Sequence, residues 1–296
     1  MSSQVFQSGV RLADHTTFRI GGPARAFRLA RSAEEVVEAA WKAEAMGLDW
    51  YVIGHGSNIL ASDTGYSGAV IAFQDNRPPI LNRDGTVTVS GGIPLFDLVR
   101  FCTAGGLGGF ENLAGIPGTV GGSIAGNAGA YGSSIGELLR SAIILDRNGN
   151  IRKSEASNIS FAYRGSSIKE RRETVLEATL SVWRRASYEI EEIVEKRLAD
   201  RGNKHPDYRV VSTAGSFFKN HQLTDGTRVA AGKLLEQAGC REYRVGNAHP
   251  WPTHANIIVT DGVSSAAEVL ELTKRMAERV GQIHGIKLES EVVYLT

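Results

Sequence analysis

The spacing of apolar and polar residues along the chain predicts several amphipathic helices. Between Ser32 and Gly47, apolar residues recur at helical spacing, and Ser32 forms a capping box with the glutamate three residues later. We expect one helix there, ended by the glycine. A second capping box, Ser265 with Glu268, predicts a helix that ends at Gly281. Further helices are expected at 95–106, 187–202 and about 230–238.

Short apolar runs bounded by turn residues predict the strands. The segment 86–92 alternates apolar and polar residues, which is typical of a half-buried strand. The segment 141–154 predicts two strands joined by a tight turn at Asn148-Gly149. The remaining strands are expected at 50–54, 69–73, 174–185, 254–259 and 290–295.

Helices and strands follow one another without a regular strand–helix–strand rhythm, so the pattern favours an α+β fold. At 296 residues the chain is long enough for one to three domains with substantial cores. The expected helix at 187–202 is highly charged, and we interpret it as a connection between domains, with a break near residues 187–205.

One segment departs from these patterns. Gly115–Gly132, GIPGTVGGSIAGNAGAYG, is rich in glycine, yet it interleaves core residues such as Ile116 and Val120. A flexible linker would carry serine and other polar residues instead. We therefore expect ordered backbone packed closely against a neighbour or a ligand. A second glycine segment, GHGSN at 54–58, directly follows an expected strand.

Two interpretations of the glycine segments remain open. Bare backbone N–H groups can cradle an anion such as a phosphate, and the same glycines can serve as tight turns between packed strands. Neither segment matches a familiar nucleotide motif. Gly54-x-Gly56 lacks the third glycine of a dinucleotide fingerprint, and the chain contains no GxxxxGK[ST].

Composition narrows the class of protein. The formal net charge of +1 argues against a dedicated nucleic-acid binder. No apolar run approaches the roughly 18 residues of a membrane span, and the first residues do not resemble a secretory signal. Two cysteines, Cys102 and Cys240, are too few for a disulfide framework and lack metal-ligand spacing. We expect a cytoplasmic location, buried core thiols, no metal site and no membrane insertion.

Eight segments carry a more specific signal through their order along the chain. They are HTTFRIGGPA (15–24), GHGSNIL (54–60), GIPGTVGGSIAGNAGAYG (115–132), FAYRGSSIK (161–169), AGSFFKN (214–220), AGKLLEQAG (231–239), HANIIV (254–259) and GIKLESEVVYL (285–295). Together they resemble the UDP-N-acetylenolpyruvoylglucosamine reductase (MurB) family. A single glycine motif would be weak support, but eight motifs in order cover essentially the whole chain.

The resemblance implies two small FAD-binding subdomains of the vanillyl-alcohol-oxidase (PCMH) type and a C-terminal α+β substrate-binding domain. The expected ranges are 1–72 with the returning strand 284–296, then 73–190, then 200–283. The chain is similar to the short class of the family, which lacks a tyrosine-bearing lid loop. It departs from the family at His221, where proline is typical, and in the unusual stretch AHPWPT before His254.

The resemblance also implies the reaction. NADPH reduces non-covalently bound FAD, and flavin N5 then delivers hydride to C3 of UDP-N-acetylglucosamine enolpyruvate. A proton reaches C2 and gives UDP-N-acetylmuramate, a precursor of peptidoglycan. The redox chemistry belongs to the flavin, and the protein binds and orients the reactants.

Three residues match the catalytic positions of the family. Arg164, in FAYRGSS, is expected to stabilise charge that develops on the substrate carboxylate, because its planar guanidinium matches a carboxylate. Ser216, in AGSFFKN, is expected to donate the proton to C2. Glu291, in LESEVVYL, is expected to act near the carboxylate, and it is preferred to Glu289 because it directly precedes Val292.

The resemblance assigns further residues to binding. Lys219, close to Ser216 in the sequence, is also a candidate for stabilising the alkoxide of Ser216. His254 and Asn256 either touch substrate or support the fold. Substrate contacts are expected from Tyr163, Lys219, Asn220 and His254. Cofactor contacts are expected from Gly54, His55, Gly56, Ser57, Asn58, Ile59, Gly115, Ile116, Pro117, Gly118, Thr119, Gly121, Gly122, Ala125, Asn127 and Gly129.

Two other functions remain alternatives. A flavin oxidase of the same superfamily, acting on an alcohol or a sugar, would share the glycine segments. It would not be expected to carry Ser216, Glu291 and SFFKN together. A non-catalytic sensor of flavin or nucleotide sugar would have no use for all three catalytic positions.

Overall fold

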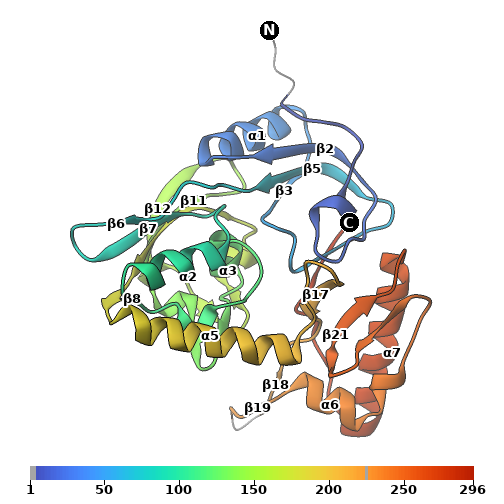
Figure 1. Cartoon of the computed structure of the whole chain (residues 1–296). Helices are drawn as coiled ribbons and strands as arrows, with labels where there is room; N and C mark the ends of the chain where they lie inside the picture. The colour runs from blue at the N-terminus through green and yellow to red at the C-terminus, as the bar shows by residue number, and fades with distance from the viewer. Residues whose placement is uncertain (1–4, 224–225) are drawn as a thin grey trace. The chain divides into compact units, whose positions relative to one another are not determined.

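The computed structural model describes residues 5–223 and 226–296, which form two compact units (Figure 1). Unit 1 comprises Met1–Gln7, Ala26–His55 and Gly68–Arg201. Unit 2 comprises Ser8–Arg25, Gly56–Ser67 and Gly202–Thr296. Both units mix helices and strands, as an α+β fold requires. The three-part division expected from the family resemblance stays a prediction.

The core of unit 1 is built on an antiparallel five-stranded sheet. Its central strand β11 is buried on both faces, because Ala142 and Ile144 join one apolar cluster and Leu145 joins another. This explains the nearly continuous apolar run in the sequence. In order across the sheet the strands are β12 (Ile151–Glu155), β11 (Leu139–Leu145), β15 (Thr174–Ser181), β7 (Thr86–Ser90) and β6 (Ile80–Leu81).

Helices cover one face of this sheet (Figure 1), and the other face shares an apolar cluster with a helix and the strands of a second sheet. One cluster joins the sheet to α2 (Leu95–Ala104), α3 (Val120–Ala125) and α5 (Ser187–Lys204), and the other joins it to α1 (Ala33–Ala45). The highly charged α5 is more than a connection between domains. Its apolar residues Ile190 and Val194 are buried in the first cluster, and the boundary between the units falls after Arg201.

Shorter strands complete the framework. A four-stranded sheet has the order β1 (Val10–Arg11), β2 (Pro23–Ala30), β5 (Tyr66–Phe73) and β3 (Trp50–Ile53). Two-stranded pairs in unit 1 are β8 (Leu107–Gly108) with β16 (Trp183–Arg184), β9 (Gly129–Ala130) with β10 (Ser133–Ser134), and β13 (Phe161–Ala162) with β14 (Gly165–Ser166), the last followed by α4 (Ser167–Glu170).

Unit 2 packs two helices against a three-stranded sheet, as Figure 1 shows for α6 (Ala231–Gln237) and α7 (Ala266–His284). The strand order is β17 (Ser212–Ser216), β21 (His254–Thr260) and β20 (Ala248–Trp251). The C-terminal strand β22 (Val293–Leu295) pairs in parallel with β4 (Ile59–Ala61), directly after GHGSN, and β18 (His221–Gln222) pairs with β19 (Arg228–Val229). No helix among the described residues is long and apolar enough to cross a membrane.

Two elements end at residues other than those predicted from the sequence. Helix α7 continues through Gly281 to His284 and ends at Gly285, whose φ of +68° suits a helix C-terminus. A helical glycine weakens a helix by about 1 kcal/mol, which the buried apolar stripe of α7 outweighs. The hairpin loop spans 146–150 rather than a two-residue turn, because Asp146 accepts hydrogen bonds from the Asn148 and Asn150 N–H groups.

Helix α7 has a second cap that the local sequence does not reveal. Besides the predicted capping box, the Asp63 carboxylate accepts from the Ala266 N–H at 2.7 Å and from the Ala267 N–H at 3.1 Å. We expect Asp63→Ala to lower the free energy of unfolding by about 1–2 kcal/mol, since it leaves these helix-end donors unpaired. Urea unfolding measures the loss. Asp63→Asn retains an acceptor and should recover most of it; equal losses for both variants would contradict a capping role.

Candidate active site

The two glycine segments approach each other within unit 1. A Cβ atom added to Gly54 would lie 2.4 Å from Thr119 Oγ1, so only glycine fits there. Thr119 is itself the N-cap of α3 and accepts from the Gly122 N–H at 3.4 Å. The contact places the end of β3 against the start of α3.

Three amides at this contact suit a ligand. The N–H groups of Gly54, His55 and Gly118 donate to no acceptor within residues 5–223 and 226–296. Unpaired backbone donors on side-chain-free loops are what a flavin ring carbonyl or a diphosphate requires. Burial lowers the pKa of His55, although Asp97 opposes the shift. The imidazole therefore favours its neutral form. The residues present fit FAD.

Other glycines in the long segment serve backbone packing, so both interpretations of that segment hold in part. A Cβ on Gly121 would lie 3.0 Å from the Gly91 and Val175 carbonyl oxygens of the sheet. A Cβ on Gly115 would lie 3.0 Å from Arg201 Cδ, and Arg201 Nε donates to the Gly115 carbonyl at 3.1 Å. The glycine segment is thus held between the sheet and α5.

Arg164 lies in the two-residue turn between β13 and β14. Its φ of +56° is left-handed, which costs an L-residue about 1–2 kcal/mol relative to glycine. Its guanidinium carbon lies 5.3 Å from the centre of the Tyr163 ring. A strained non-glycine residue of this kind persists where the surrounding structure holds it, and such residues cluster at functional sites.

Among the other expected cofactor residues, Asn127 supports this turn. Its Nδ2 donates to the Ala162 carbonyl at 2.9 Å, and its Oδ1 accepts from the Gly136 N–H at 3.1 Å. Ala125 ends α3, and its carbonyl accepts from Ser166. Ile116 packs against the unit 1 core, Gly129 belongs to β9, and Pro117 lies in the same loop before α3.

Ser216 ends β17 of unit 2, where the strand is irregular. The pairing with β21 shifts register between Thr213 and Ser216, and Gly215 between them has a left-handed φ of +76°. The Gly215 N–H donates to Thr213 Oγ1 at 3.1 Å rather than to the neighbouring strand. Such a bulge re-aims the side chain that follows it, and bulges of this kind are common beside active sites.

Backbone hydrogen bonds place Glu291 beside Phe217, the residue that follows Ser216. The Glu291 N–H donates to the Phe217 carbonyl at 2.8 Å, one peptide unit away from Ser216. The GHGSN segment joins the same group, because Asn58 Nδ2 donates to the Glu291 carbonyl at 2.9 Å. The Asn58 carbonyl accepts from the Val293 N–H at 3.0 Å. Gly56, Ser57 and Ile59 of the segment belong to unit 2 as well, and Arg164 belongs to unit 1.

Lys219 and Glu289 form a separate pair. The Lys219 N–H donates to the Glu289 carbonyl at 2.9 Å, and Lys219 Nζ lies 3.5 Å from Glu289 Oε2. Glu289 is therefore occupied with the lysine and largely exposed, whereas Glu291 is half-buried beside Phe217. The observed pairing agrees with the preference for Glu291 as the functional carboxylate, which stays a prediction.

Asn256 supports the fold. It is buried, and its amide both accepts from the Phe218 N–H at 2.9 Å and donates to the Phe218 carbonyl at 2.8 Å. His254 accepts from the Asn256 N–H at Nδ1, 3.3 Å away, and burial lowers the pKa of its imidazole. A neutral ring with a proton on Nε2 follows. Asn220 Oδ1 accepts from the Ala231 N–H at 3.1 Å, at the start of α6.

Arg19 lies in the HTTFRIGGPA motif, but no role for it was predicted from the sequence. Arg19 has a left-handed φ of +53°, and its guanidinium donates to the carbonyls of 208–210 and to Ser212 Oγ. Thr17 exchanges two hydrogen bonds with the Thr213 backbone, at 2.7 and 3.1 Å. The segment thus braces the start of β17, the strand that ends at Ser216. The order of the family motifs indicated that this segment belongs to the site. Its contacts with 208–213 could not be predicted, because they join residues about 190 positions apart in the chain.

The two cysteine thiols are not candidates for the catalytic chemistry. Both cysteines are buried, and burial raises the pKa of Cys102 to about 12 and that of Cys240 to about 11. Because the thiolate is the reactive form, we expect neither to react with a disulfide reagent at neutral pH while the protein is folded. Titration in denaturant should release both. Rapid labelling of the native protein would contradict the buried placement.

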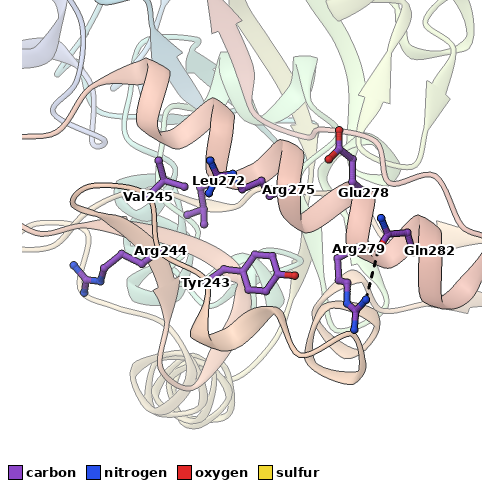
Figure 2. Close-up of a pocket in the computed structure, with 8 residues that line it drawn as sticks. All are labelled: Tyr243, Arg244, Val245, Leu272, Arg275, Glu278, Arg279 and Gln282. Atoms are coloured by element: carbon purple, nitrogen blue, oxygen red, sulfur yellow. Dashed lines mark hydrogen bonds between the residues drawn. The ribbon is translucent and has the colours of Figure 1, made fainter.

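A pocket of about 470 Å³ beside α7 lies outside these contacts. It contains Arg244, Arg275 and Arg279, but none of the expected site residues, and Figure 2 shows that the arginine side chains point apart. Arg244 pairs with Asp261 at 3.1 Å and Arg275 with Glu271 at 2.7 Å. We find no convergent group of donors in this pocket.

Comparison with known proteins agrees with the architecture. Residues 24–155 match the profile of the FAD binding domain, and residues 205–295 match that of the UDP-N-acetylenolpyruvoylglucosamine reductase C-terminal domain. A moss protein, BBE-like 1 of Physcomitrella patens, shares the fold with a TM-score of 0.55 at 12% identity over 94% of this chain and 86% of its own. The fold is therefore the two-subdomain FAD-binding type with a C-terminal α+β domain.

Individual relatives cover nearly the whole chain. UDP-N-acetylenolpyruvoylglucosamine reductase of Heliobacterium modesticaldum is 35% identical over 95% of this chain and 88% of its own, and that of Moorella thermoacetica is 36% identical over 95% and 90%. The crystal structure of the Thermus caldophilus reductase (MurB) aligns with a TM-score of 0.80, at 29% identity, over 98% of this chain and 100% of its own. The chain therefore belongs to the UDP-N-acetylenolpyruvoylglucosamine reductase family of FAD-containing oxidoreductases.

Proposed function

We propose that the protein reduces UDP-N-acetylglucosamine enolpyruvate to UDP-N-acetylmuramate with NADPH, in peptidoglycan synthesis. Family membership along nearly the whole chain supports the overall reaction. The chemistry that bound FAD supplies is hydride transfer, from NADPH to the flavin and from flavin N5 to C3 of the enolpyruvyl group. The cytoplasmic location expected from the sequence belongs to the same proposal.

Ser216 donates the proton that C2 needs. The bulge at Gly215 fixes the direction of its side chain, and a backbone hydrogen bond brings Glu291 beside the next residue, Phe217. An isolated serine hydroxyl is a weak acid, so it requires neighbours that stabilise the alkoxide. This backbone contact, which places Glu291 beside the segment that carries Ser216, is the observation that supports the proposal. The alternatives, an oxidase or a sensor, give no reason for it.

Arg164 stabilises the negative charge that hydride addition pushes onto the substrate carboxylate. A fixed cation aimed at developing charge favours the transition state more than the ground state. The left-handed backbone of Arg164 supports this role, because glycine would occupy the turn at lower cost. Lys219, Asn220 and His254, on unit 2, bind the anionic and polar parts of the sugar nucleotide.

Product analysis tests the proposed reaction. The purified protein, loaded with FAD, is mixed with the enolpyruvyl sugar nucleotide and either NADPH or NADH, and the products are identified by mass spectrometry. We expect a product heavier by two hydrogen atoms, with one NADPH consumed for each, and slower turnover with NADH. Consumption of NADPH with unchanged sugar nucleotide would contradict the proposal and favour the alternative function, a flavin oxidase.

A further inference from the structure

The hairpin that carries Arg164 depends on contacts outside itself. β13 and β14 form only two residue pairs, Phe161 with Ser166 and Ala162 with Gly165. A hairpin this small is not stable alone, and the left-handed Arg164 adds strain at its turn. The place of the Arg164 backbone, from which the guanidinium extends, therefore depends on the contacts that hold the hairpin.

Ser166 makes the attachment at one strand of the hairpin. Its hydroxyl donates to the Ala125 carbonyl at 2.7 Å, at the C-terminal end of α3. The same oxygen accepts from the Lys169 N–H at 3.3 Å and so caps α4. Asn127 holds the opposite strand through the Ala162 carbonyl. Together the two side chains fix both strands to residues 125–127 of the glycine segment.

Ser166 is buried, unlike the residues that can touch a ligand. Its exposed fraction is 1%, whereas Arg164 two residues earlier is half-buried and lies at the turn. A hydroxyl enclosed in this way, with both its donor and its acceptor engaged by the protein, acts on a reaction only through the groups that it positions.

We infer that Ser166 is a positioning residue for Arg164. Its hydrogen bond to Ala125 holds the strained hairpin against α3 and so determines where the guanidinium lies. The inference rests on the role proposed above for Arg164. Without the hydroxyl, the arginine and its charge remain, but the turn is free to relax. A displacement of about 1 Å in a catalytic group can slow a reaction about 100-fold.

A double-mutant cycle tests the inference. Ser166→Ala, Arg164→Met and the double variant are loaded with FAD, and flavin absorbance is followed by anaerobic stopped flow. We expect Ser166→Ala to slow reoxidation by the enolpyruvyl sugar nucleotide by about 10- to 100-fold, with reduction by NADPH changed less than about twofold. In the Arg164→Met background, the same serine change should alter reoxidation by less than about twofold, because its effect passes through the arginine.

Three controls keep the outcome decisive. Ser154→Ala removes another buried serine hydroxyl, on β12, and should leave both half-reactions unchanged. Ser166→Cys retains the side-chain volume and a weaker donor, so it should give an intermediate rate and serves if Ser166→Ala does not fold. Thermal unfolding of each variant shows which of them are folded under the assay conditions.

The results separate this inference from the proposed function. An equal slowing by Ser166→Ala in both backgrounds, or reoxidation at the wild-type rate, would overturn the positioning role while Arg164→Met remains slow. Wild-type reoxidation by Arg164→Met would instead overturn the role of the arginine itself, and the inference with it.

Discussion

Replacement of Ser216 by alanine is expected to abolish most of the second half-reaction while leaving the first intact. NADPH should still bleach the flavin at nearly the wild-type rate, because that step needs no proton donor at C2. Reoxidation by the enolpyruvyl sugar nucleotide should slow by about 10²–10⁴-fold, the usual contribution of a positioned general acid. Anaerobic stopped-flow absorbance separates the two steps.

Ser216→Cys is the matched variant for this prediction. A thiol keeps a transferable proton at the same position, so reoxidation should be faster than in Ser216→Ala. The bulge that aims the side chain comes from Gly215, which neither change alters. Normal reoxidation by Ser216→Ala, with the flavin fully loaded, would show that the proton comes from another group.

Replacement of Arg164 by glycine should lower activity strongly and leave stability nearly unchanged. Glycine favours the left-handed backbone at φ +56°, so the native turn gains about 1–2 kcal/mol, partly offset by the greater freedom of glycine in the unfolded chain. We expect the free energy of unfolding to stay within about 1 kcal/mol of wild type. Reoxidation should fall by about 10²–10³-fold, because the fixed cation at the developing carboxylate charge is lost.

Arg172→Gly is a matched control on the same unit. Arg172 also has a left-handed φ, of +55°, and it is an exposed arginine that pairs with Asp49 at 2.9 Å. The change removes the same side chain and the same strain, so stability should respond similarly while both half-reactions continue at the wild-type rate. A comparable loss of activity in both variants would mean that the effect of Arg164→Gly is not specific to its position.

Local signals in the sequence predicted most of the elements. Ser265 with Glu268 forms the predicted capping box of α7. At the start of α1 only half of the predicted box forms, because Ser32 accepts from the Glu35 N–H while the Glu35 carboxylate accepts from the Arg31 N–H. These caps are readable because the groups involved lie within four residues of each other. Gly281 misled the prediction of the end of α7, since burial of the helix outweighs one poor helix former.

The contacts of the site are beyond local signals. Asn58 and Glu291 meet although 233 residues separate them, and Thr17 meets Thr213 across 196. Nothing in the spacing of apolar residues indicates which distant segments pair. The family motifs predict Ser216 and Glu291 as site residues, but the bulge at Gly215 and the backbone bond from Glu291 to Phe217 appear only in three dimensions.

The arginines with a left-handed backbone conformation were also beyond prediction from the local sequence. Propensity predicts glycine or asparagine at φ near +55°, and the sequence at Arg19 and Arg164 therefore gave no sign of the backbone that they adopt. Such residues persist where surrounding contacts determine the conformation. For Arg19 these contacts are the carbonyls of 208–210, and for Arg164 they are the attachments of Ser166 and Asn127.

The most direct test of the proposed reductase reaction is an anaerobic absorbance spectrum of the FAD-loaded protein, recorded through addition of NADPH and then of UDP-N-acetylglucosamine enolpyruvate. We expect a yellow protein that bleaches with NADPH and recovers its colour with the sugar nucleotide in the absence of oxygen. A protein that bleaches but recovers only when oxygen is admitted would contradict the reductase function and support an oxidase. A protein that takes up no FAD would contradict the assignment of the glycine segments as a cofactor site.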